Sequence, residues 1–144
     1  MTDRPRDHHA SDASAQFARG RRAEEAGALD QAHDLYQRAV DLEPGHADWY
    51  YRLGCVCLKT GRFELARHNF EAGLALLPGD PRMLTNLGAA LDHLGRRDEA
   101  VSAYQRASFH DQAPAAAFHN LGALYAEEGR TEDAIVAFTE AVRR

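Results

Sequence analysis

The sequence predicts an all-α protein, an α-solenoid of four helix–turn–helix units. The first observation behind this prediction is a 34-residue period at which the same residue types return without an insertion. The second is that glycine recurs twice in every period, and the third is that one aromatic residue recurs with it. The series are Gly20, Gly54, Gly88 and Gly122; Gly27, Gly61, Gly95 and Gly129; Ala32, Ala66, Ala100 and Ala134; Tyr36, Phe70, Tyr104 and Phe138; and Ala39, Gly73, Ala107 and Ala141.

The two glycine series predict two different roles. Glycine inside a helix costs about 1 kcal/mol relative to alanine, so its return within an apolar periodic segment, as at Gly88, indicates close approach of a second helix. The aromatic side chain of Tyr104 is expected to fill the space between the two helices. Gly95 falls between two helical patterns, where a left-handed residue can end a helix. Each unit is therefore predicted to be a helix, a tight turn and a second helix.

This pattern resembles the tetratricopeptide repeat (TPR) family, whose unit is a 34-residue helix–turn–helix. The resemblance covers roughly residues 13–144 and implies a right-handed stack of helix pairs with a concave groove that binds other proteins. It implies no particular partner. The matching residues are Leu84, Leu87, Gly88, Leu91, Gly95, Ala100, Tyr104 and Ala107 in repeat three, with Pro44 and Pro78 at the position of the family's proline.

The first element along the chain is the segment 1–11, predicted to be a disordered N-terminal tail because it is polar and shows no periodicity. Its pair His8–His9 has no further metal ligand nearby in the sequence, so a solvated tail is favoured over a metal site. The TPR domain is predicted to cover 12–144. Its repeats are predicted at approximately 13–46, 47–80, 81–114 and 115–144.

The repeats differ in ways that predict their ends. Repeat one has Arg19 where later repeats have leucine, as expected for a terminal repeat with one side facing water. Asp80 is predicted to cap the helix that begins at Pro81. In repeat three, Gln112 replaces the family's proline, so the turn between repeats three and four is predicted to be altered. In repeat four, Thr131 followed by two acidic residues predicts the start of the second helix.

Composition limits the classes of function. The formal net charge of −5 argues against a general nucleic-acid binder, which normally has a basic excess. Cys55 and Cys57 lie two residues apart in one predicted helix, so they point about 200° apart and can neither pair nor chelate well. They are interpreted as small apolar residues in a reducing compartment. The sequence has no secretory signal and no apolar run of membrane-spanning length, so a cytoplasmic location without membrane insertion is expected.

Candidate peptide-binding residues follow from the resemblance, because the first helix of each repeat lines the groove of TPR folds. Asn86 and Asn120 are equivalent residues one repeat apart, and Arg52 precedes them in the same row. An asparagine amide can both donate to and accept from a peptide backbone, and similar asparagine rows line the TPR grooves of protein O-GlcNAc transferases. The alternative is that these asparagines are only solvated. The predicted peptide-binding groove residues are Tyr51, Arg52, Arg82, Asn86, His119 and Asn120.

A specialised version of this groove is not expected. TPR modules that clamp the C-terminal carboxylate of heat-shock proteins use lysine and asparagine in the first repeat, where this chain has Ser14 and Ala18. Arg52 and Arg82 remain candidates for holding one acidic side chain.

The sequence predicts no enzyme, no catalytic residue and no cofactor. It contains no H-E-x-x-H, no glycine-rich phosphate loop, no C-x-x-C and no G-x-S-x-G. His93 and His119 both fall on the predicted groove, where a peptide contact or solvation is favoured over a role as general base.

Three hypotheses for the function stay open. The favoured one is a non-catalytic scaffold or adaptor that binds a peptide segment of a partner protein in the concave groove. The second is self-assembly through the C-terminal repeat, because the sequence stops at Arg144 without the extra amphipathic helix of many TPR arrays, and exposed apolar surface marks interfaces. The third is a regulatory part of a larger enzyme system.

Overall fold

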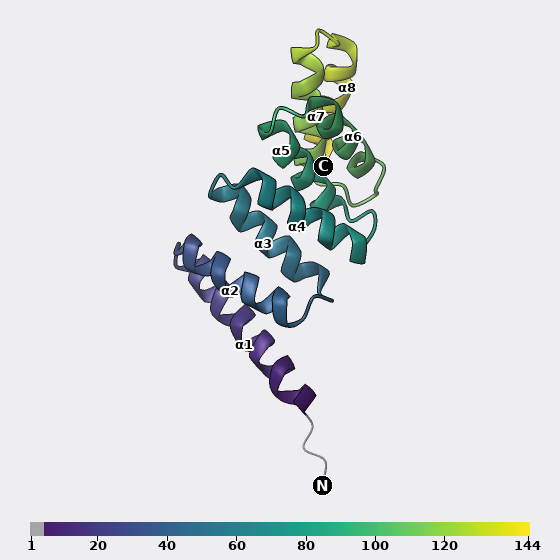
Figure 1. Cartoon of the computed structure of the whole chain (residues 1–144). Helices are drawn as coiled ribbons and strands as arrows, with labels where there is room; N and C mark the ends of the chain where they lie inside the picture. The colour runs from purple at the N-terminus through teal and green to yellow at the C-terminus, as the bar shows by residue number, and fades with distance from the viewer. Residues whose placement is uncertain (1–4) are drawn as a thin grey trace. The chain divides into compact units, whose positions relative to one another are not determined.

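The structure, a computed structural model, describes the backbone of residues 5–144 and the side chains of residues 12–144. This part of the chain contains helices and no strand (Figure 1). The predicted fold class, an all-α solenoid of four helix–turn–helix repeats, is confirmed. The helices are α1 (Pro5–Glu25), α2 (Leu29–Leu42), α3 (Ala47–Lys59), α4 (Phe63–Leu76), α5 (Pro81–His93), α6 (Arg97–Ser108), α7 (Ala115–Glu127) and α8 (Thr131–Arg143).

Helix α1 begins at Pro5, so its backbone includes part of the segment 1–11 that the sequence predicts to be a disordered tail. Proline suits a first helical turn because the amide hydrogen that it lacks would have no partner within the helix. Residues 1–4 of the predicted tail and the side chains of His8 and His9 lie outside the described residues. The disorder of the tail stays a prediction.

The chain forms two compact halves, an N-terminal half that ends at Leu76 and a C-terminal half from Leu77 to Arg144. In each half, the two helices of a repeat pack on one another, and the second helix of one repeat packs on the first helix of the next. These neighbours are α2 with α3 in the N-terminal half and α6 with α7 in the C-terminal half. The core of each half therefore lies between consecutive helices.

Glycine ends the first helix of every repeat, as predicted. Gly27, Gly61, Gly95 and Gly129 all have a positive φ, between 75° and 77°. At Gly95 the turn is closed by two backbone hydrogen bonds of 2.9 Å, from Gly95 N to Asp92 O and from Arg96 N to Leu91 O. This is the Schellman arrangement, which satisfies carbonyl groups that the helix end leaves open. The equivalent bond returns at Arg62 and Arg130.

The other glycine series allows close approach of the two helices in a repeat, which confirms the second prediction. A Cβ atom added at Gly54 would lie 2.6 Å from Cε1 of Phe70, and one added at Gly88 would lie 2.6 Å from Cε1 of Tyr104. The aromatic rings therefore lie directly on the glycine backbone. The contact is looser in repeat four, where the corresponding distance from Gly122 to Phe138 is 3.0 Å.

Two predicted helix ends are confirmed in detail. Oδ1 of Asp80 accepts hydrogen bonds from the backbone N–H groups of Arg82 and Met83, each 3.0 Å long, and Pro81 occupies the first helical position. The turn after repeat three is altered as predicted, because α6 has 12 residues and α4 has 14, although both begin at the same repeat position. The early end of α6 leaves Phe109 87% exposed.

Candidate functional site

A polar cluster surrounds Tyr36 on the second helix of repeat one. The hydroxyl of Tyr36 donates a 2.5 Å hydrogen bond to Oε2 of Glu24, and Nζ of Lys59 lies 3.5 Å from Oε1 of the same carboxylate. Burial raises the pKa of Tyr36, the hydrogen bond and charge of Glu24 raise it further, and the charges of Arg52 and Arg21 oppose the shift. The predicted groove residue Arg52 thus belongs to a charged cluster built by α1, α2 and α3.

An equivalent cluster surrounds Tyr104 in the C-terminal half. Burial raises the pKa of Tyr104 to about 12, the charge of Asp92 on α5 contributes to the rise, and a hydrogen bond with the Asn120 side chain opposes it. Asn120 is half-buried and lies on α7, the first helix of the next repeat. The protein itself therefore holds the amide of Asn120 in place, beside the tyrosine of the preceding repeat.

The acidic partner of each tyrosine is a feature that sequence analysis missed. Glu24 and Asp92 occupy the same position of repeats one and three, which carry Tyr36 and Tyr104. Repeats two and four have phenylalanine in place of tyrosine, and they have Leu58 and Ala126 in place of the acid. The acid and the tyrosine therefore occur together or not at all, a signal that was visible in the sequence. It indicates that the carboxylate and the hydroxyl act as a pair.

Raising the pH from 9 to 11 is expected to lower the free energy of unfolding through Tyr104. Tyrosine in an unfolded chain ionises near pH 10, whereas the pKa of folded Tyr104 is about 12. Between these values the unfolded chain has released a proton that the folded chain retains, so stability is complete below about pH 10 and falls as the pH rises. Urea unfolding at pH 9 and pH 11 measures the loss, which should be smaller in Tyr104→Phe. Equal losses in the two proteins would contradict the assignment.

The other predicted groove residues lie in separate environments. Tyr51 is half-buried, with its ring centroid 6.4 Å from that of Phe70. Arg82 is exposed and its guanidinium lies 3.4 Å from the Asp80 carboxylate. Asn86 is half-buried.

Thr85, which helical periodicity also places on this side of α5, is only 4% exposed, and its hydroxyl donates to the Pro81 carbonyl at 2.6 Å. Thr85 is therefore turned into the helix and not toward a ligand.

The structure brings His119 and Asn120 together at one cavity. The cavity has a volume of about 410 Å³ and lies between α7 and α8 in the C-terminal half. The rest of its lining is apolar and includes Phe138, whose ring centroid lies 5.5 Å from that of His119, and Val142, which is 88% exposed. The amide and the imidazole can form hydrogen bonds with a peptide backbone, and the apolar wall can pack on one side chain. Arg82 and Asn86 do not line this cavity.

The two cysteines are free, with Cys55 half-buried and Cys57 buried. Burial raises the pKa of both thiols, which keeps them protonated and unreactive. Within residues 12–144, no group of three or more histidine, cysteine, aspartate or glutamate side chains is placed to hold a metal ion. Among the described helices, none combines the length and the apolar character needed to cross a membrane.

Residues 16–144 match the family described as the cilia and flagella-associated protein 70 middle TPR-like domain. The mouse protein O-mannosyl-transferase TMTC1 is 34% identical over 85 residues, which are 59% of this chain and 9% of the mouse protein. The chain thus spans a small part of that relative.

Among solved structures, MamA from Desulfovibrio magneticus RS-1 has a TM-score of 0.84 and 26% identity, covering 92% of this chain and 75% of MamA. YrrB has a TM-score of 0.80 and 26% identity, covering 91% of this chain and 68% of YrrB, and is described as a TPR protein with an unusual peptide-binding site.

Proposed function

Because the chain belongs to the family of the cilia and flagella-associated protein 70 middle TPR-like domain, we propose that this TPR protein-interaction scaffold binds a peptide segment of a partner protein in its concave groove. It acts as an adaptor and not as a catalyst. The peptide-binding residues are Tyr51 and Arg52 in the N-terminal half and Arg82, Asn86, His119 and Asn120 in the C-terminal half.

The Asn120 amide is the observation that carries the proposal. It is held by Tyr104 at the edge of an apolar cavity of about 410 Å³. A side chain that is fixed before binding loses little conformational entropy when the ligand arrives. Its amide offers both a donor and acceptors to a peptide backbone, while Phe138 and Val142 offer an apolar surface to a side chain. The description of YrrB as a peptide-binding TPR protein supports this use of the fold.

The triple variant Arg52→Ala, Asn86→Ala, Asn120→Ala is expected to lose at least tenfold in affinity for the partner. Each lost hydrogen bond weakens binding by about 0.5–1.5 kcal/mol, and three together exceed a factor of ten. The partner is captured from a lysate with the wild-type chain, identified, purified and titrated against both proteins by calorimetry. Loss of the Asn120–Tyr104 bond is expected to lower the free energy of unfolding by about 1 kcal/mol, so the far-UV circular dichroism of the variant is checked first.

A matched control removes arginines that lie outside the predicted groove. Arg38 and Arg106 are exposed at equivalent positions of α2 and α6, and Arg38→Ala with Arg106→Ala should bind the partner as the wild type does. Unchanged affinity in the triple variant would show that the groove assignment is wrong.

Self-association is a second candidate function, favoured by the apolar face of repeat four. In repeat three, Tyr104 and Ala107 are 2% and 0% exposed, and α7 packs on their helix. The equivalent residues of repeat four are Phe138 and Ala141, which are half-buried at the cavity beside the exposed Val142. A helix of a second copy that resembles α7 would fit this face.

Light scattering after size exclusion tests this second candidate. The mass of the wild-type chain is expected to rise above 15.9 kDa as its concentration increases. Val142→Glu places a charge on the apolar face and should restore the monomer mass, whereas Phe109→Ala, outside this face, should not. A mass that stays at the monomer value at millimolar concentration would contradict self-association.

A further inference from the structure

Repeats one and three place an acid beside a buried tyrosine by the same local geometry. The acids are Glu24 and Asp92, and each lies four residues, or about one helical turn, after the glycine on which the tyrosine ring packs. A Cβ atom added at that glycine would lie 2.6 Å from the ring of Tyr36 in repeat one and 2.6 Å from the ring of Tyr104 in repeat three. The two acids therefore occupy the same place relative to their tyrosines.

The carboxylate of Glu24 is bound from within the N-terminal half. It accepts a 2.5 Å hydrogen bond from the Tyr36 hydroxyl, and Nζ of Lys59 lies 3.5 Å from its other oxygen. Arg21 and Arg52 place two further positive charges near the same tyrosine. The Glu24 side chain is only 13% exposed. The N-terminal half thus shows that an acid at this position can be bound by a lysine of the following repeat.

The C-terminal half has the acid but lacks the equivalent cations. The positions of Arg21, Arg52 and Lys59 are occupied there by Ala89, Asn120 and Glu127. Three basic side chains are thus replaced by two neutral ones and an acid. Among the described side chains, the charge that shifts the pKa of Tyr104 is that of Asp92, whereas two arginines oppose the shift at Tyr36. The charge of Asp92 is therefore not balanced as that of Glu24 is.

Asp92 is exposed and available to a ligand. The arginines that follow it in the sequence are bound to other acids, in the pairs Arg96–Glu99 and Arg97–Glu127. Arg82 lies ten residues before Asp92 on α5, about 15 Å away along the helix axis. Asp92 is also the penultimate residue of α5, and the C-terminal end of a helix has a partial negative charge that favours cations. A basic side chain of a ligand would therefore be attracted to this end of α5.

The amide of Asn120 adds a second acceptor beside Tyr104. The hydrogen bond between Asn120 and Tyr104 lowers the pKa of the tyrosine, so the amide N–H donates and the phenolic oxygen accepts. The amide oxygen of Asn120 is not used in this bond. Because an ammonium or guanidinium group only donates hydrogen bonds, a carboxylate and an amide oxygen beside the same tyrosine suit it.

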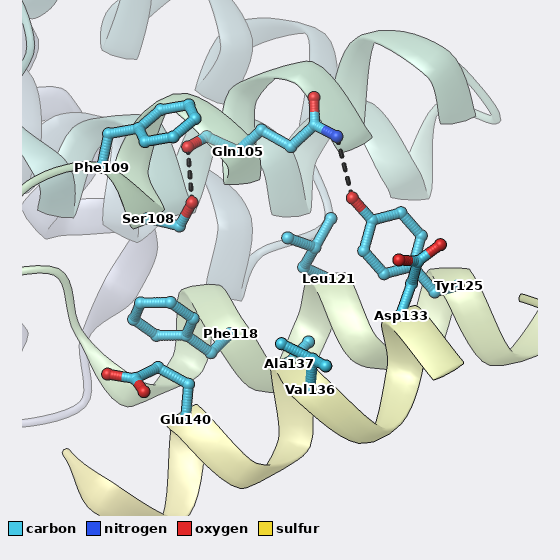
Figure 2. A pocket seen from close by; sticks show the side chains of 10 residues that line it. All are labelled: Gln105, Ser108, Phe109, Phe118, Leu121, Tyr125, Asp133, Val136, Ala137 and Glu140. Carbon is cyan, nitrogen blue, oxygen red and sulfur yellow. Dashed lines mark hydrogen bonds between the residues drawn. The ribbon is translucent and has the colours of Figure 1, made fainter. Parts of the chain in front are cut away.

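The acids at another cavity of the C-terminal half are paired within the chain. This cavity, of about 350 Å³, lies between α6, α7 and α8, and Figure 2 shows Asp133 next to Tyr125 and Glu140 next to Phe118. The paired atoms are Nε of Arg130 with Oδ2 of Asp133, at 2.9 Å, and Nε of Arg144 with Oε1 of Glu140, at 3.0 Å. The same guanidinium groups lie over the rings of Tyr125 and Phe118. These two acids are thus bound as Glu24 is, and they differ from Asp92.

We propose that the peptide bound in the groove carries a lysine or arginine whose cation pairs with Asp92, so that Asp92 selects basic segments of partner proteins. The cation of the ligand takes the place beside Asp92 that Lys59 has beside Glu24. Ala89, one turn earlier on α5, leaves the room that Arg21 fills in repeat one. This inference rests on the proposed groove and names the chemistry of its ligand.

Selection from a phage-displayed library of random dodecapeptides tests the proposal. Phage bound to the wild-type chain are screened again on Asn120→Ala, and the peptides lost on this variant are kept as groove ligands. These peptides should share a lysine or arginine at one position. One of them is synthesised with a fluorophore and titrated by anisotropy at pH 8, where histidine carries little charge. Asp92→Asn should weaken its binding about tenfold, because a charge-assisted hydrogen bond is lost.

A second peptide, with norleucine in place of the shared basic residue, tests whether the cation meets Asp92 itself. It should bind the wild type about tenfold more weakly than the basic peptide does. On Asp92→Asn the two peptides should bind alike, because both changes remove the same interaction. Asp111→Asn is the matched control, since it removes the same charge from an exposed position between α6 and α7. It should leave the affinity unchanged. Circular dichroism checks that all variants keep the helicity of the wild type.

The results distinguish the groove from the cation site. If no selected peptide depends on Asn120, the proposed function fails and the cation site fails with it. If peptides depend on Asn120 but share no basic residue, or keep their affinity on Asp92→Asn, the groove stands and the cation site is overturned. Independent, additive effects of Asp92→Asn and of norleucine would also overturn direct pairing.

Discussion

Replacing Phe70 with alanine is expected to lower the free energy of unfolding by about 3 to 5 kcal/mol. The Phe70 side chain is fully buried between α3 and α4. Its ring lies on the backbone of Gly54, where a Cβ atom would be 2.6 Å away. Because glycine has no side chain that could move into the space, the cavity left by the ring cannot be filled from α3. The full cost of a cavity in the core is therefore expected.

Urea unfolding followed by far-UV circular dichroism measures this effect. Phe109→Ala is the matched control, because it removes the same side chain from a position that is 87% exposed. That substitution should change the free energy of unfolding by no more than about 0.5 kcal/mol. A loss at Phe70 as small as the loss at Phe109 would mean that the aromatic series does not form the core of the repeats.

The sequence was sufficient to predict the repeats because their determinants are local and recurrent. Helices α3, α5 and α7 begin at Ala47, Pro81 and Ala115, the first residues of predicted repeats two, three and four. Each turn needs a residue in the left-handed conformation, which favours glycine, and each aromatic ring needs a second glycine opposite it. Both requirements therefore leave a recognisable residue in every 34-residue period. The start of α1 at Pro5 left no such signal, because that segment has no apolar periodicity.

The candidate sites were harder to predict because they depend on contacts between repeats. Periodicity places Thr85 and Asn120 on one side of their helices, but it does not show that Thr85 bonds to its own helix or that Asn120 bonds to Tyr104. The cavity beside Asn120 is lined by residues of both α7 and α8, which only the packing of the two helices brings together.

Replacing Gly88 with alanine is expected to lower the free energy of unfolding by about 1 to 3 kcal/mol. Alanine should favour the helix by about 1 kcal/mol relative to glycine, so helix propensity alone predicts the opposite sign. The added Cβ would lie 2.6 Å from Cε1 of Tyr104, which is 2% exposed and held by Asn120. The ring cannot move away, and α5 and α6 must separate. Urea unfolding gives the sign of the change directly.

The equivalent substitution in repeat four is the control for this prediction. At Gly122 the added Cβ would lie 3.0 Å from Phe138, a half-buried ring that can shift outward. If the ring shifts, the close contact is removed and only the higher helix propensity of alanine affects stability. Gly122→Ala should therefore change the free energy of unfolding by less than about 1 kcal/mol. If both variants were stabilised equally, close packing against the aromatic ring would not explain why glycine recurs at this position. A clear difference between them would show that the buried tyrosine makes glycine necessary at Gly88.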